Sequence, residues 1–143
     1  MTFPAPKPGL VIRYSFLWSH EADAGADEGS KDRPCAIVVA QKQVEGEVRT
    51  LVAAITHLEP DDPAAAMELP SAVSKALKLD GARHWLKLDE LNRFVWPGYD
   101  LRQIPGRQGE YAYGMLPQPL FEELRVKILA RNQAGKARTV KRD

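Results

Sequence analysis

The run from Asp32 to Ala40 constrains the fold of this chain more than any other stretch. A charged pair and Pro34 lead directly into six small or β-branched apolar residues, and such a run predicts a buried strand entered from a loop. Arg33 then lies at the mouth of that strand, and Pro34 restricts its backbone to extended geometry. A guanidinium held at the rim of a sheet suits phosphate recognition. The alternative role for such an arginine is a surface ion pair.

The 143 residues have room for one domain with a single core. The boundaries that we expect are a proline-rich lead-in at 1–8, one domain at 9–130, and a basic, flexible tail at 131–143. A net charge of +1 gives no overall attraction to nucleic acid. The single cysteine, Cys35, excludes an internal disulfide and fits a reducing compartment. No apolar run is long enough for a signal peptide or a membrane span, so we expect a cytoplasmic protein without membrane partners.

The pattern of apolar residues predicts mostly strands. We expect them at 10–18, 35–43, 48–56, 67–69, 84–91 and 111–114, with a hairpin turn at 45–47. A short helix is predicted at 70–79 and a closing helix at 117–130. The acidic segment 19–32 lacks an apolar period and reads as a long loop, functional or mobile. This order favours a mainly β fold, with α-helices added to a strongly bent, barrel-like antiparallel sheet.

Most of the common catalytic motifs are missing. The chain has no glycine-rich phosphate loop, no paired Cys or His at metal-binding spacing, and no Gly-x-Ser-x-Gly turn. Its three histidines, His20, His57 and His84, are far apart, so a metal site would require three separated segments to converge. We therefore expect no metal ligand set and no cofactor.

Polar residues at strand ends are the remaining candidates for chemistry. Arg33 and Thr56 lie at nearly equal distances from Gly46 in the predicted hairpin turn, so the two side chains can face each other at the open end. On its own, a threonine there is more typical of a simple strand former. Other polar residues lie at the ends of the third and later strands, at His57, Asp89, Glu90 and Asn92.

Three stretches resemble, in order and spacing, the successive signatures of the MazF/PemK (Kid) toxin family. Gly9–Ile12 opens a strand after glycine, 29–39 contains Gly-Ser-Lys-Asp-Arg-Pro before an apolar strand, and 53–57 reads Ala-Ala-Ile-Thr-His. The likeness covers about residues 9–60. The part from Trp85 onward resembles the family more loosely.

The resemblance implies an SH3-like barrel with a C-terminal helix, usually a homodimer. It also implies a metal-independent endoribonuclease that cleaves single-stranded RNA, arrests growth and is restrained by a cognate antitoxin protein. The family's catalytic arginine falls on Arg33 and its threonine or serine on Thr56. The expected substrate-binding residues are Ser30, Lys31, His57, Asp89, Glu90 and Asn92.

Three departures from the family pattern are visible. The loop at 19–32 is longer and more acidic, the helix near 71–79 looks like an insertion, and Asn92 stands where a family arginine is expected. The residues at the strand ends nevertheless agree with the cleavage chemistry. Metal-free cleavage needs a cation for the charge on phosphate and groups that carry protons. Arg33 supplies the cation and Thr56 can bind a phosphate oxygen, while His57 or a carboxylate could move the protons.

The alternative function is a non-catalytic barrel that binds a protein or nucleic acid. The acidic loop and the missing arginine favour this alternative.

Overall fold

In a computed structural model that describes residues 3–29 and 31–142, a long hairpin forms the centre of the sheet. It consists of β2 (Arg33–Lys42) and β3 (Val48–Thr56), paired antiparallel. Gly46 has a φ of 92°, which a residue with a Cβ rarely adopts, so glycine suits the turn. The third predicted strand is confirmed at its exact bounds.

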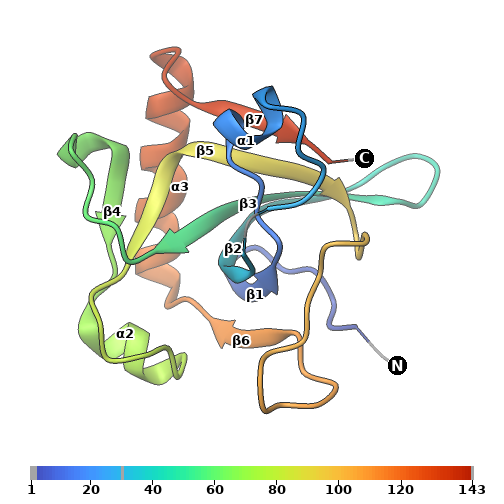
Figure 1. The fold of residues 1–143 in the computed structure, drawn as a ribbon, viewed down its shortest axis with the longest axis horizontal. Helices are drawn as coiled ribbons and strands as arrows, with labels where there is room; N and C mark the ends of the chain where they lie inside the picture. Colours follow the sequence, from blue (N-terminus) through green and yellow to red (C-terminus); the bar gives the residue numbers. More distant parts are fainter. Residues whose placement is uncertain (1–2, 30, 143) are drawn as a thin grey trace.

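The sheet curls strongly around this hairpin (Figure 1), with the strand order β4-β5-β3-β2-β1-β6. The strands on either side of the hairpin are β1 (Leu10–Tyr14), β4 (Ala66–Glu68), β5 (Trp85–Val95) and β6 (Ala112–Met115). All pairs along this path are antiparallel. The mainly β, strongly bent antiparallel sheet is thus confirmed.

Alternate residues of the central strands enter two separate hydrophobic clusters, because successive side chains of a strand point to opposite faces. Cys35 and Ile37 of β2 join one cluster, and Ala36 and Val38 join the other. Both faces of the hairpin are therefore covered. Burial of the Cys35 thiol raises its pKa and keeps it protonated.

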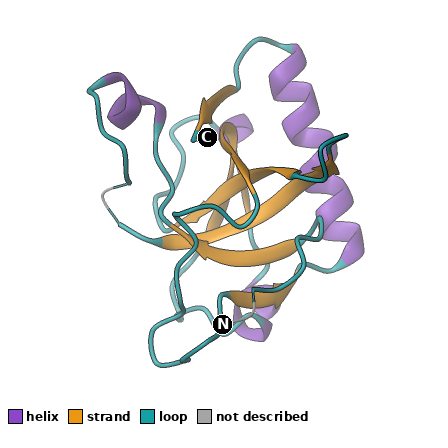
Figure 2. Cartoon of the chain, turned by 90° about the vertical axis from the view of Figure 1, so that its right-hand side faces the viewer, coloured by secondary structure: helices purple, strands orange, loops and turns teal. Residues whose placement is uncertain are grey.

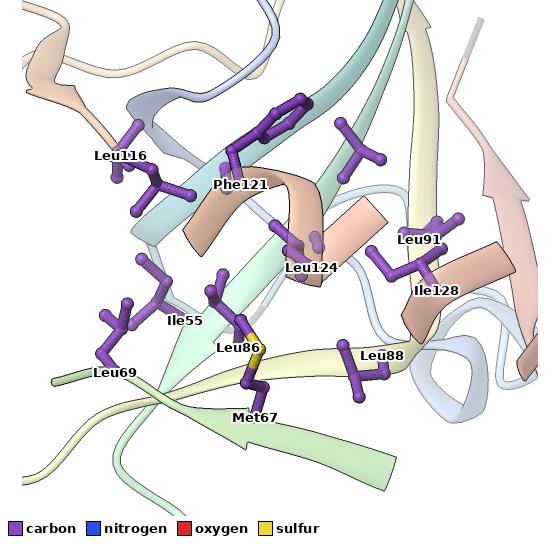
Figure 3. Close-up of a cluster of buried hydrophobic side chains, with 14 of the residues drawn as sticks. Ile55, Met67, Leu69, Leu86, Leu88, Leu91, Leu116, Phe121, Leu124 and Ile128 are labelled. Atoms are coloured by element: carbon purple, nitrogen blue, oxygen red, sulfur yellow. The ribbon is translucent and has the colours of Figure 1, made fainter. Parts of the chain in front are cut away.

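The C-terminal helix α3 (Gln118–Gln133) covers one face of the sheet (Figure 2). Its Phe121, Leu124 and Ile128 are buried against side chains of the sheet (Figure 3). The helical period predicts an apolar stripe of Leu120, Leu124 and Ile128 with Phe121 beside it, and of these four Leu120 is only partly buried. The expected inserted helix is also present as α2 (Ser71–Ala76), and a 3-10 turn, η1 (Pro63–Ala65), precedes β4.

Two segments have more structure than their sequences suggest. The segment at 19–32, predicted as a loop, begins with a short helix, α1 (Ser19–Asp23). The C-terminal tail forms β7 (Arg138–Lys141), which pairs parallel with β5. α1 and β7 lie side by side (Figure 1), and Arg138 binds both carboxylate oxygens of Asp23, at 2.9 and 3.0 Å. The acidic segment is thereby tied to the last strand.

Asn92, an expected substrate-binding residue, is fully buried. Its amide donates to the carbonyl of Leu17 and its oxygen accepts from the Leu17 amide, both at 2.8 Å. Arg142 also donates to this oxygen, at 2.9 Å. Asn92 thus joins β5 to the chain after β1 and to the segment after β7, which is a structural role.

Within residues 3–29 and 31–142, no helix combines the length and apolar character needed to cross a bilayer.

Candidate functional site

The open end of the central hairpin brings Arg33 and Thr56 together. Cys35 pairs with Ala54 across the hairpin, and extending that register by two residues places Arg33 opposite Thr56. A bulge between Ile37 and Val39 sets this register. The juxtaposition inferred from the distances to Gly46 is therefore present.

The Arg33 guanidinium lies over the ring of Trp18, with 4.9 Å between its central carbon and the ring centroid. Across residues 3–29 and 31–142, no acidic side chain forms an ion pair with it, and its buried Nε has no hydrogen-bond partner. The alternative role as a surface ion pair is thus not observed there. Burial lowers the pKa of Arg33, and Glu21 only partly opposes the shift. A partly desolvated guanidinium without a direct ion-pair partner favours an anionic ligand.

Thr56 ends β3 and is 9% exposed. Its Oγ1 accepts a hydrogen bond from the Leu58 amide at 3.2 Å. A hydroxyl in this position still has its own proton to donate. Thr56 can therefore hold the turn after β3 and also donate to an oxygen beside Arg33.

Two cavities share Lys31, Arg33 and Thr56 in their walls. We call the first, of about 320 Å³, the histidine cavity, because His57, His84 and Asp80 also line it. We call the second, of about 480 Å³, the carboxylate cavity, because Glu59, Asp61 and Glu90 also line it. The expected catalytic pair, Arg33 and Thr56, thus lies between the histidine cavity and the carboxylate cavity.

His57 follows Thr56 directly, and an acidic side chain orients it. Its Nε2 lies 3.1 Å from Oδ2 of Asp80, whose Oδ1 lies 3.1 Å from Nε2 of His84. The ring centroids of His57 and His84 are 4.7 Å apart. Burial lowers the pKa of His84, with Asp80 opposing the shift, so the inner imidazole is neutral at neutral pH.

The other expected substrate-binding residues are placed unevenly. Lys31 and His57 line the site as predicted, and Glu90 lines the carboxylate cavity while accepting from the Ser19 amide at 2.7 Å. Asp89 lines neither cavity, and its carboxylate lies 3.5 Å from Lys87 Nζ. Asn92 is structural, as described above. Ser30 lies outside the described residues.

Sequence reasoning missed three residues of this site: Trp18, Asp80 and His84. Trp18 ended a predicted strand, and nothing in that run marked it as a platform for Arg33. Histidine spacing suggested no metal ligand set, yet the turn after α2 brings Asp80 and His84 against His57. The one feature of the local sequence that could have indicated these two residues is that Asp80 and His84 lie four positions apart.

No protein-family model matches the chain, and no curated protein matches its sequence.

Proposed function

We propose that this protein is an endoribonuclease of the MazF/PemK type, the toxin of a type II toxin-antitoxin system, and that it cleaves single-stranded RNA without a metal. The observation that carries the proposal is the half-buried Arg33 guanidinium, free of ion pairs within the described residues and opposite the Thr56 hydroxyl. A cytoplasmic homodimer restrained by an antitoxin protein belongs to the same proposal.

The chemistry assigns each residue one task. The 2′-hydroxyl of a ribose loses its proton and attacks the adjacent phosphorus, and the bond to the 5′-oxygen breaks. This gives a 2′,3′-cyclic phosphate and a 5′-hydroxyl. Arg33 binds the phosphate oxygens as their negative charge grows, and Thr56 donates to one of them. The imidazole of His57, oriented by Asp80, takes the proton of the 2′-hydroxyl, and the leaving 5′-oxygen takes a proton from water.

Thr56→Val is expected to lower the cleavage rate by about tenfold to a hundredfold, whereas Thr56→Ser should stay within a few-fold of the parent. Valine has the shape of threonine without the hydroxyl that donates to phosphate. Cleavage of a labelled single-stranded RNA would be followed on a gel, with circular dichroism as the check on folding. A folded Thr56→Val protein with full activity would remove Thr56 from the mechanism.

Expression in a bacterial host tests the proposal in vivo. The parent should arrest growth, and Arg33→Ala should relieve the arrest at equal protein level. Absence of arrest, or a mutant as toxic as the parent, would contradict the toxin assignment. RNA binding by the purified protein without cleavage would instead favour a non-catalytic barrel, to which the carboxylates beside Arg33 lend some support.

A further inference from the structure

Three side chains from separate segments converge at one end of the histidine cavity. His57 follows β3, Asp80 lies in the turn after α2, and His84 directly precedes β5. Both imidazole Nε2 atoms lie 3.1 Å from an oxygen of the Asp80 carboxylate. The side chains of His57 and Asp80 are 51% and 61% exposed, and that of His84 is 4% exposed. The cluster thus has a fixed inner member and two members that can move.

The spacing of these atoms is close to that of a metal ligand set. One ligand atom from each side chain can be chosen so that all lie within 4.8 Å of one another. Ligand atoms around a tetrahedral zinc ion, with bonds of about 2.0 to 2.1 Å, lie roughly 3.3 Å apart. The side chains of His57 and Asp80 are exposed and therefore have room to rotate toward this spacing.

His84 has the support that a metal-binding histidine needs. Its Nδ1 lies 3.2 Å from Oγ of Ser74, a residue of α2 that is 6% exposed. Ligating histidines almost always hydrogen-bond through their second ring nitrogen, which fixes the ring and the tautomer. A hydroxyl accepts as well as donates. Ser74 can therefore accept from Nδ1–H and leave the Nε2 lone pair directed toward His57 and Asp80.

We propose that His57, Asp80 and His84 bind a divalent transition-metal ion of the Zn²⁺ class. Two imidazole nitrogens and one carboxylate select such an ion over Mg²⁺ or Ca²⁺, which prefer oxygen ligands. Three protein ligands leave one position open to the cavity. Lys31, Arg33 and Lys78 line that cavity, so an anion is the favoured fourth ligand. The proposal does not depend on the proposed function, in which the metal-free protein is the active form because a bound metal ion would occupy His57.

Titration of the EDTA-treated, dialysed protein with Co²⁺ tests the proposed metal site, because tetrahedral Co²⁺ has visible absorption bands. We expect one bound equivalent that Zn²⁺ displaces. His57→Ala and Asp80→Asn should each weaken Co²⁺ binding by at least about tenfold, and Ser74→Ala by about tenfold, through loss of the ring support. The first two variants change exposed side chains and leave the core intact.

The matched controls are His20→Ala and Asp61→Asn, a histidine and an aspartate outside the cluster. Both should bind Co²⁺ like the parent. The proposal would be overturned by a parent without a tetrahedral Co²⁺ spectrum, or by unchanged binding in His57→Ala and Asp80→Asn. It would equally be overturned if the controls lost as much affinity as these variants. Co²⁺ binding by a protein whose metal-free form cleaves no RNA would contradict the proposed function alone.

Discussion

Arg33→Ala is expected to lower the rate of RNA cleavage by about a hundredfold to a thousandfold while the protein stays folded. The guanidinium is the cation that the proposed mechanism places on the phosphate. Among the described residues, no acidic side chain forms an ion pair with it. It lies at the first residue of β2 rather than in the core, so its main structural contact is with Trp18. Loss of that contact costs about 0.5 to 1 kcal/mol.

Arg49→Ala is the matched control, because Arg49 is an exposed arginine toward the other end of β3. It should cleave RNA at the parent rate. Arg33→Lys should recover part of the lost rate, since lysine restores the charge without the planar, two-pronged donor. Initial rates on a labelled RNA, with circular dichroism on the same samples, make the comparison. A folded Arg33→Ala protein as active as the parent would exclude Arg33 from catalysis.

Arg142→Ala is expected to lower the free energy of unfolding by about 3 kcal/mol, the largest stability effect that we foresee for one side chain. The Arg142 side chain is 3% exposed and lies 3.0 Å from Asp100. It also donates to the Ser15 carbonyl at 2.8 Å and to Asn92 at 2.9 Å. Its removal would leave a largely buried carboxylate and a buried amide oxygen without this donor.

The loss should depend on pH. Burial already raises the pKa of Asp100, with Arg142 and Arg102 opposing the shift. Without Arg142 the folded-state pKa rises further above the unfolded value, so the variant loses stability as pH rises through the folded pKa. The deficit should therefore shrink as pH falls toward about 4, where the carboxyl gains a proton. Lys141→Ala, an exposed neighbour on β7, should stay within about 0.5 kcal/mol of the parent. Urea denaturation at several pH values measures both variants, and equal stabilities would contradict the buried-pair account.

Local patterns predicted the centre of this fold well. The apolar run after Pro34 and the turn at Gly46 were enough to place β2 opposite β3, and with them Arg33 opposite Thr56. The closing helix followed from its apolar period. These features depend on residues close in sequence, which is why a pattern reveals them.

The parts that were missed depend on contacts between distant segments. β7 is a short polar strand that forms beside β5, and its residues Arg-Thr-Val-Lys show little apolar alternation. Asn92 looked like a site residue because the resemblance places a family arginine there, yet the backbone of Leu17 binds its amide group. The approach of His84 to His57 crosses 27 residues of sequence and depends on the inserted α2 and the turn that follows it.

The most direct test of the proposed endoribonuclease is incubation of the purified parent protein with a labelled single-stranded RNA in excess EDTA, followed by analysis of the new ends. The account predicts cleavage under chelation that leaves a 2′,3′-cyclic phosphate and a 5′-hydroxyl, and that Arg33→Ala abolishes. No cleavage, or cleavage that requires added Mg²⁺ and leaves a 5′-phosphate, would contradict it.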